Sequence, residues 1–156
     1  MNYVELCTNI QEICENTFTD DELAMFTRQA EQKIYNFVQL AYLRKNVTGT
    51  LSANNKYLAA PGDYLSTYSI AVIDATGEYH YLINKDVNWI REAYPKPTST
   101  GTPKYYAIFG PTTTSGTPPA LTNELSFILG PTPSAALGVE LHYFFMPESI
   151  VDAGTT

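Results

Sequence analysis

The sequence predicts an α+β fold, in which an N-terminal helical hairpin with one long helix is followed by an antiparallel β domain, sandwich or barrel-like, with long Pro/Thr loops. Two observations support this prediction. Between Thr19 and Leu43 the apolar residues recur at spacings of three and four, which is the period of one helix face. From Val47 onward apolar and polar residues alternate, which is the period of a half-buried strand. Helices are therefore expected first and strands after them.

The first helix is expected to begin at the capping box Asn2-Tyr3-Val4-Glu5 and to end near Asn16. One apolar stripe runs along it, formed by Tyr3, Leu6, Cys7, Ile10, Ile13 and Cys14. Only residues 16–18 link it to the next helix, and two helices joined so tightly must be near neighbours. We therefore expect the apolar stripes of the two helices to face each other.

The second helix is expected to begin at the capping box Thr19-Asp20-Asp21-Glu22 and to continue without interruption to Leu43. Such a helix would be about 36 Å long at ~1.5 Å per residue. The stripe that should pack against the first helix consists of Leu23, Phe26, Ala30, Ile34, Phe37 and Ala41. This hairpin would form the first half of the core.

A second stripe lies about 100° around the same helix. It consists of Ala24, Arg28, Glu31, Tyr35, Val38 and Tyr42. One helical partner cannot cover both stripes, so the second should meet the downstream sheet or another subunit. Five of its members are therefore candidate subunit-interface residues: Arg28, Glu31, Tyr35, Val38 and Tyr42. Among them, Glu31 is either an ordinary solvated acid or the partner of Arg28 or Arg44.

The second part of the chain is predicted to form about six or seven strands. The clearest hairpin flanks the turn Asp74-Ala75-Thr76-Gly77. A short helix is expected over Val87–Tyr94, capped by Asp86. Lys96–Pro103 and Gly110–Ala120 are rich in Pro, Thr and Gly and are expected to be long exposed loops. The expected strands cover residues 47–51, 56–59, 68–72, 79–83, 105–109, 125–129 and 139–145.

These elements divide the chain into three parts. Residues 1–45 are the helical hairpin, residues 46–150 the antiparallel β domain, and residues 151–156 a tail. The final residues, Asp152-Ala153-Gly154-Thr155-Thr156, have the pattern of a lead-in to another helix. We therefore expect the tail to begin a further helical segment, with the native chain continuing beyond Thr156.

Charge and hydropathy argue against nucleic-acid and membrane partners. The net charge is −7, and the nine Lys and Arg residues are scattered, with no cluster beyond Arg44-Lys45. Proteins that grip nucleic acid neutralise phosphates with clustered basic residues, so specific DNA binding is not expected. The sequence has no basic and apolar leader and no apolar run near eighteen residues. A soluble protein that is not exported is therefore the default expectation.

No catalytic, cofactor-binding or metal-binding residue is predicted. His80 and His142 stand singly in different expected strands, and no Cys pair has metal-binding spacing. The sequence also has no Gly-rich phosphate loop and no Gly-x-Ser-x-Gly turn. The acids Asp20–Glu22 are explained by their favourable interaction with the helix dipole. We therefore expect no enzyme activity.

Several segments, taken in order, resemble one known family. They are Tyr3–Leu6, Phe26 with Ala30–Ile34, Tyr57–Leu65, Pro103–Tyr106, Leu129–Pro131 and Val139–Pro147. Their order and spacing resemble the head-to-tail adaptor, or connector, proteins of tailed bacteriophages. The resemblance spans most of the chain.

The resemblance implies a structural virion protein that forms a homo-oligomeric ring of twelve copies under the portal, extends the DNA channel and attaches the tail. Its partners would be the portal protein and a tail or nozzle protein, and DNA would pass through the channel without specific binding. It implies a place in the neck or tail of the virion after synthesis in the host cytoplasm, with no cofactor and no membrane.

Two alternatives stay open. The first is another neck or tail component, such as a stopper or tail-tube protein. The second is a carbohydrate-binding or adhesion β module, whose sugar platform would use aromatic residues such as Tyr79, Tyr81 and Trp89.

Overall fold

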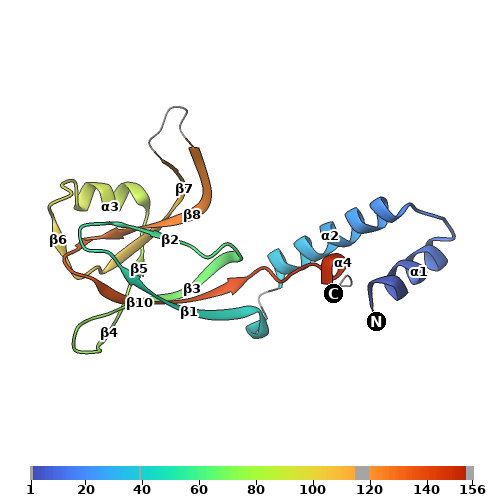
Figure 1. Cartoon of the computed structure of the whole chain (residues 1–156), viewed down its shortest axis with the longest axis horizontal. Coiled ribbons are helices and arrows are strands. Elements are labelled where there is room, and N and C mark those ends of the chain that lie inside the picture. Colours follow the sequence, from blue (N-terminus) through green and yellow to red (C-terminus); the bar gives the residue numbers. More distant parts are fainter. Residues whose placement is uncertain (1, 39, 115–119, 154–156) are drawn as a thin grey trace. The chain divides into compact units, whose positions relative to one another are not determined.

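Helices lead the chain and strands follow, which confirms the predicted α+β class (Figure 1). The structure, a computed structural model, describes residues 2–38, 40–114 and 120–153. Two units are formed: a helical unit of Met1–Leu43 with Met146–Thr156, and a β unit of Arg44–Phe145. These boundaries differ from the sequence-based ones because residues 44–45 belong to the β unit and residues 146–150 to the helical unit.

Both predicted capping boxes are present at the starts of the N-terminal helices. Helix α1 covers Tyr3–Cys14 and helix α2 covers Asp20–Phe37. The Asn2 side chain accepts a hydrogen bond from the N–H of Glu5 at 2.8 Å, and the Glu5 carboxylate accepts one from the N–H of Asn2 at 3.1 Å. Thr19 and Glu22 form the same reciprocal pair at the start of α2. Local sequence therefore determines where both helices begin.

Helix α2 ends at Phe37, so the prediction that it continues to Leu43 is wrong. Val38 is extended, and its N–H donates the last helical hydrogen bond to the carbonyl of Ile34. A single 3₁₀ turn, η1, follows at Ala41–Leu43 before the chain enters the first strand at Arg44. No Gly or Pro lies in this segment to end the helix. The usual helix-breaking residues therefore do not mark the end of α2.

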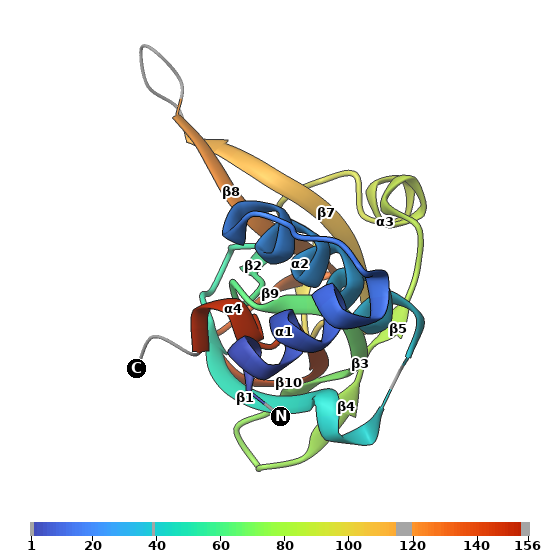
Figure 2. The same cartoon turned by 90° about the vertical axis from the view of Figure 1, so that its right-hand side faces the viewer.

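The β unit consists of two four-stranded sheets that pack face to face as an open sandwich (Figures 1 and 2). The strand order is β1-β10-β3-β4 in sheet A and β2-β8-β7-β5 in sheet B, with a separate short pair of β6 and β9. The bounds are β1 Arg44–Leu51, β2 Tyr57–Ala59, β3 Tyr64–Ile73, β4 Tyr79–Tyr81, β5 Ile83–Asn84, β6 Thr100–Gly101, β7 Tyr105–Thr114, β8 Ala120–Gly130, β9 Thr132–Pro133 and β10 Leu137–Phe145.

The core lies between the two sheets. Phe127 and Leu129 of sheet B belong to the same buried cluster as Ile70, Val72 and Leu141 of sheet A. On the outer face of sheet B, helix α3 (Val87–Ala93) packs through Ile90. Asp86 caps this helix, as predicted. The alternation of apolar residues along the strands therefore locates the main core correctly.

Two features of the strands differ from the sequence-based expectation. The predicted loop over Gly110–Ala120 is wrong in its described part, because β7 continues to Thr114 and β8 begins at Ala120. Thr is a good strand former, and pairing with β8 outweighs the loop-like composition. Residues 115–119 lie outside the described residues. Two parallel pairs, β5 with β7 and β6 with β9, also join the otherwise antiparallel sheets.

Candidate functional site

Two of the predicted interface residues make contacts within the helical unit. The Arg28 guanidinium lies 2.8 Å from the carboxylate of Asp152. Glu31 is half-buried, and its carboxylate accepts a hydrogen bond from the backbone N–H of Ile150 at 2.9 Å. Both partners belong to or adjoin helix α4 (Ile150–Ala153), which lies beside α2 in Figures 1 and 2. Glu31 therefore takes a backbone partner near the C-terminus instead of Arg28 or Arg44.

The other three predicted residues differ in exposure. Tyr35 is half-buried, and burial together with the charge of Glu31 raises the pKa of its hydroxyl. Val38 is 40% exposed and Tyr42 is 89% exposed. A subunit-interface role for the five residues stays a prediction.

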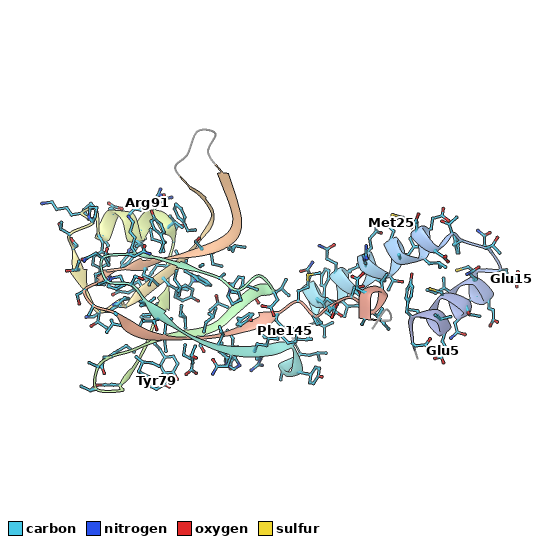
Figure 3. All side chains as sticks on the ribbon, in the orientation of Figure 1. Glu5, Glu15, Met25, Tyr79, Arg91 and Phe145 are labelled. Atoms are coloured by element: carbon cyan, nitrogen blue, oxygen red, sulfur yellow. The ribbon has the colours of Figure 1, made fainter. Side chains whose placement is uncertain are left out.

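The stripe expected to pack against α1 is mostly exposed instead. Leu23 is its one buried member among the described residues, and the covered face of α2 continues through Ala24, Thr27, Glu31 and Tyr35. The other five members of the stripe are exposed, and the four that lie on α2 we call the α2 apolar row: Phe26, Ala30, Ile34 and Phe37. Met25 projects from the same helix and is also exposed (Figure 3).

The segment that contacts α2 explains why the stripe expected to be buried is exposed. Helix α1 has no buried residue, and Ile13 and Cys14 at the end of its own stripe are exposed. The C-terminal segment, by contrast, binds α2 through Glu31 and Arg28. A segment distant in sequence therefore contributes to the covered face of α2. The α2 apolar row is an exposed apolar surface of the kind that marks contact sites.

Basic residues at the start of the β unit are bound within that unit. The ammonium group of Lys45 lies 2.6 Å from the Asp63 carboxylate, and the Tyr143 hydroxyl donates to the same carboxylate at 2.8 Å. Burial favours a raised pKa for Asp63, but these two hydrogen bonds outweigh it and lower that pKa. Burial and the neighbouring carboxylate raise the pKa of Tyr143 to about 12. The Arg44 guanidinium lies over the ring of Tyr68 at 4.2 Å.

The two sides of the sandwich are built differently. On one side the edge strands β1 and β2 leave an apolar hollow of about 340 Å³ between the sheets, and we call this side the open edge. On the other side the chain passes from sheet A to sheet B at Leu82. The N–H of Leu82 donates to the carbonyl of Ile70, and the N–H of Ile83 donates to the carbonyl of Lys104. We call this side, comprising β4, Leu82 and β5, the closed edge.

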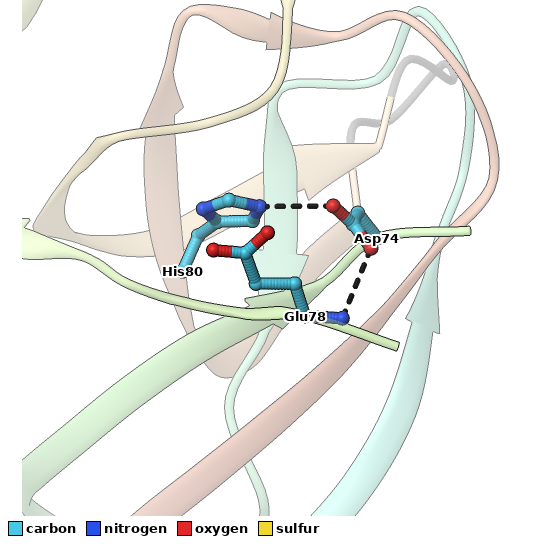
Figure 4. Close-up of side chains that lie close together, drawn as sticks. All are labelled: Asp74, Glu78 and His80. Carbon is cyan, nitrogen blue, oxygen red and sulfur yellow. Dashed lines mark hydrogen bonds and ion pairs between the residues drawn. The ribbon is translucent and has the colours of Figure 1, made fainter. Parts of the chain in front are cut away.

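Three side chains that can ligate a metal come together at the hairpin turn between β3 and β4 (Figure 4). The ligand atoms of Asp74, Glu78 and His80 all lie within 4.8 Å of one another. Sequence reasoning missed this group because it treated His80 alone, although the Asp-x-x-x-Glu-x-His spacing within a hairpin was a usable signal.

The Asp74 carboxylate already has several hydrogen-bond donors. One oxygen accepts from the Thr76 hydroxyl at 2.6 Å and from the N–H groups of Thr76 and Glu78, and the other lies 3.1 Å from Nε2 of His80. The Thr76 hydroxyl, followed by His80, holds the pKa of Asp74 well below its ordinary value. Through these contacts Asp74 stabilises the turn.

The three aromatic residues considered for a sugar platform do not line one surface. Tyr79 and Tyr81 line a hollow at the closed edge, together with Tyr105. The Trp89 ring, which comes from α3, is not part of that lining and packs edge to face on Tyr105 at 4.8 Å. No observation on this surface favours the carbohydrate-binding alternative.

Comparison with known protein families identifies the family to which the chain belongs. Residues 1–156 match the family model described as SU10 adaptor protein. The chain belongs to this family. It is therefore a phage head-to-tail adaptor, a structural protein of the virion neck that interacts with portal and tail components. A search of curated proteins found no match.

The family assignment confirms the resemblance inferred from the ordered segments between Tyr3 and Pro147. The SU10 adaptor family is a structural family and not a class of enzymes. In the part of the adaptor that the structure describes, no helix has the length and apolar character needed to cross a bilayer. Because the adaptor interacts with portal and tail components, its exposed surfaces are the candidates for these contacts, among them the α2 apolar row and the two edges of the β unit.

Proposed function

We propose that the adaptor forms a ring of twelve copies under the portal, where it extends the DNA channel and attaches a tail or nozzle protein. The observation that carries this proposal is the family match over residues 1–156. A closed ring needs head-to-tail contacts between two unlike patches of each subunit. The open and closed edges of the β unit are unlike patches of this kind. The subunit is made in the host cytoplasm and assembles into the neck.

The distribution of basic groups supports a channel that does not bind DNA specifically. Of the nine Lys and Arg residues, Arg28 and Lys45 are paired with carboxylates. Arg44, Lys56, Lys85 and Arg91 lie over aromatic rings of their own unit. These cations are dispersed and the net charge is −7, so neither unit, over its described residues, has a basic patch that would retain a moving polyanion. DNA would pass through without specific contacts.

The helical unit is proposed to contact the neighbouring subunit. Val38 and Tyr42 of the predicted interface are exposed, and the α2 apolar row adds Phe26, Ile34 and Phe37 to them. Arg28 and Glu31 would act on this interface through the C-terminal segment that they hold.

Deletion of the gene in the phage tests the function. We expect electron microscopy to show heads that fill with DNA and then leak it, with no tails attached. A plasmid copy of the wild-type gene should restore tailed, infectious particles. Tailed and infectious particles without any copy of the gene would contradict the proposal.

Imaging of intact necks separates the adaptor from a stopper or tail-tube protein. An adaptor ring should contact the portal directly and show twelve copies. Density for the chain that touches only other neck or tail proteins would instead support the alternative role.

A further inference from the structure

The two edges of the β unit are unlike surfaces. Sheet A runs from β1 to β4 and sheet B from β2 to β5, so the open edge and the closed edge lie at opposite ends of both sheets. Two patches at opposite ends of one unit can join successive copies head to tail. This inference rests on the proposed ring.

The open edge presents a groove with an apolar floor. Val139 and Leu141, which belong to the main core, form this floor, and Val47 of β1 and Leu58 of β2 form its sides. Strand β1 pairs with β10 over eight residues without a bulge and has no strand on its other side. Long, regular edge strands are usually blunted or covered, because they attract other chains. The open edge therefore has no covering strand or helix among the described residues of the β unit.

The closed edge presents exposed apolar side chains. Because neighbouring residues of an extended chain point to opposite sides, the inward position of Leu82 directs Tyr81 and Ile83 outward. Leu82 is 8% exposed, whereas Tyr81 is 69% and Ile83 57% exposed. These two exposed apolar side chains border the hollow of the closed edge, on the side opposite the groove.

The charges of the two edges are complementary. Residues 44–63, which contain β1 and β2, have three basic residues and one acid, a net charge of +2, in a chain of net charge −7. Residues 74–86, which contain β4 and β5, have three acids and one base with His80 neutral, and Lys104 also lines this edge, so its net charge is −1. Complementary charges favour the correct register between two surfaces and disfavour the pairing of like edges.

We propose that Tyr81 and Ile83 of one copy insert into the groove between β1 and β2 of a second copy of this chain. The contact is heterologous, so it repeats from copy to copy and leaves both edges covered in a closed ring. The apolar floor and the two exposed side chains supply the centre of the contact, and the charged residues around them supply its rim.

Thiol crosslinking tests the contact without altering the apolar floor of the groove or the inserted side chains. In a chain with Cys7→Ser and Cys14→Ser, Thr48→Cys marks the open edge and Asn84→Cys marks the closed edge; both positions are exposed. The variants are supplied from plasmids to the gene-deleted phage, and purified particles are treated with a short bis-maleimide. Mixed particles should give a crosslinked dimer, each single variant should give none, and a chain with both substitutions should give a ladder.

Matched variants show whether the proposed side chains form the contact that the crosslink reports. Tyr81→Glu should abolish the mixed crosslink, and its melting temperature should match wild type because Tyr81 is exposed. Glu92→Cys on the exposed side of α3 is the control partner for Thr48→Cys and should give no dimer.

Three outcomes would overturn the proposal. A dimer from Thr48→Cys alone would mean that like edges meet. A crosslink from Thr48→Cys to Phe37→Cys of another copy, without one to Asn84→Cys, would mean that the α2 apolar row occupies the groove. Absence of the mixed dimer from particles that contain the adaptor would also overturn it. If the adaptor is absent from particles, the proposed function fails, and the same crosslinking of concentrated purified adaptor decides the edge contact separately.

Discussion

The Glu31 carboxylate accepts a hydrogen bond from the backbone N–H of Ile150, although the two residues are 119 positions apart in the chain. This bond joins α2 to the start of α4, and the exposed pair of Arg28 and Asp152 lies on the same two elements. The helical unit is thus closed by a segment that follows the whole β unit.

Substitution of Glu31 tests how much this bond contributes. Glu31→Ala leaves the half-buried N–H of Ile150 without its acceptor and should destabilise the helical unit by about 1–2 kcal/mol. Arg28→Ala should cost less than about 1 kcal/mol, because both members of its ion pair are more than half exposed. Hydrogen exchange of the amides of residues 150–153 measures both effects. Faster exchange in Arg28→Ala than in Glu31→Ala would contradict this order.

Leu23 and Phe37 distinguish the observed packing of α2 from the one expected from periodicity. Leu23 is 1% exposed, so Leu23→Ala should cost about 2–5 kcal/mol. Phe37 is 80% exposed, so Phe37→Ala should change the free energy of unfolding by no more than about 0.5 kcal/mol. Denaturant unfolding of both variants is the measurement. Equal losses of stability would instead indicate that Phe37 is buried in the core.

Gly130 lies where α3 approaches β8 most closely. A Cβ atom at this position would be 2.9 Å from Cδ2 of Tyr94 and 3.0 Å from Cγ2 of Ile90, so Gly130→Ala should cost about 1–3 kcal/mol. Gly62→Ala is the matched control, because nothing lies within 4 Å of its added methyl group. Thermal unfolding should separate the two variants. A melting temperature for Gly130→Ala equal to that for Gly62→Ala would show that α3 can move away freely.

The contact of Tyr143 with Asp63 predicts a loss of stability in alkali. The pKa of Tyr143 is raised from its ordinary value of 10.0 to about 12. Between these two pH values the unfolded chain releases the proton while the folded chain keeps it, so stability falls as pH rises. The loss should be at most about 3 kcal/mol, because each pKa unit corresponds to about 1.4 kcal/mol. Tyr143→Phe should weaken this pH dependence, measured by urea unfolding at a series of pH values; an unchanged dependence would assign it to other groups, such as Tyr64, whose pKa is also raised.

Features encoded by neighbouring residues could be predicted from the sequence. The capping boxes at Asn2 and Thr19, the turn at Asp74 and the alternation along β10 depend on residues a few positions apart. The covered face of α2 could not be predicted in this way. Periodicity shows that a helix has two apolar stripes, but the choice between them depends on Ile150 and its neighbours, far along the chain.

The local sequence pattern also could not predict which strands pair with each other. Strands β1 and β2 are consecutive, yet they join different sheets through β10 and β8. The open edge follows from this choice, so the groove could not be located before the topology was known. The closed edge, in contrast, is built from the short run Tyr79–Asn84, where alternating Tyr and Ile residues indicated a strand but not the crossing at Leu82.

The return of residues 146–153 to α2 also affects the order in which the protein can fold during synthesis. Residues 44–145, which form the β unit, are all translated before the segment that closes the helical unit. At about 5–20 residues per second, α2 waits on the order of 5–20 s for that segment after leaving the ribosome. During this interval the covered face of α2 and the α2 apolar row are both unprotected, so we expect the nascent helices to be the part of the adaptor that chaperones bind.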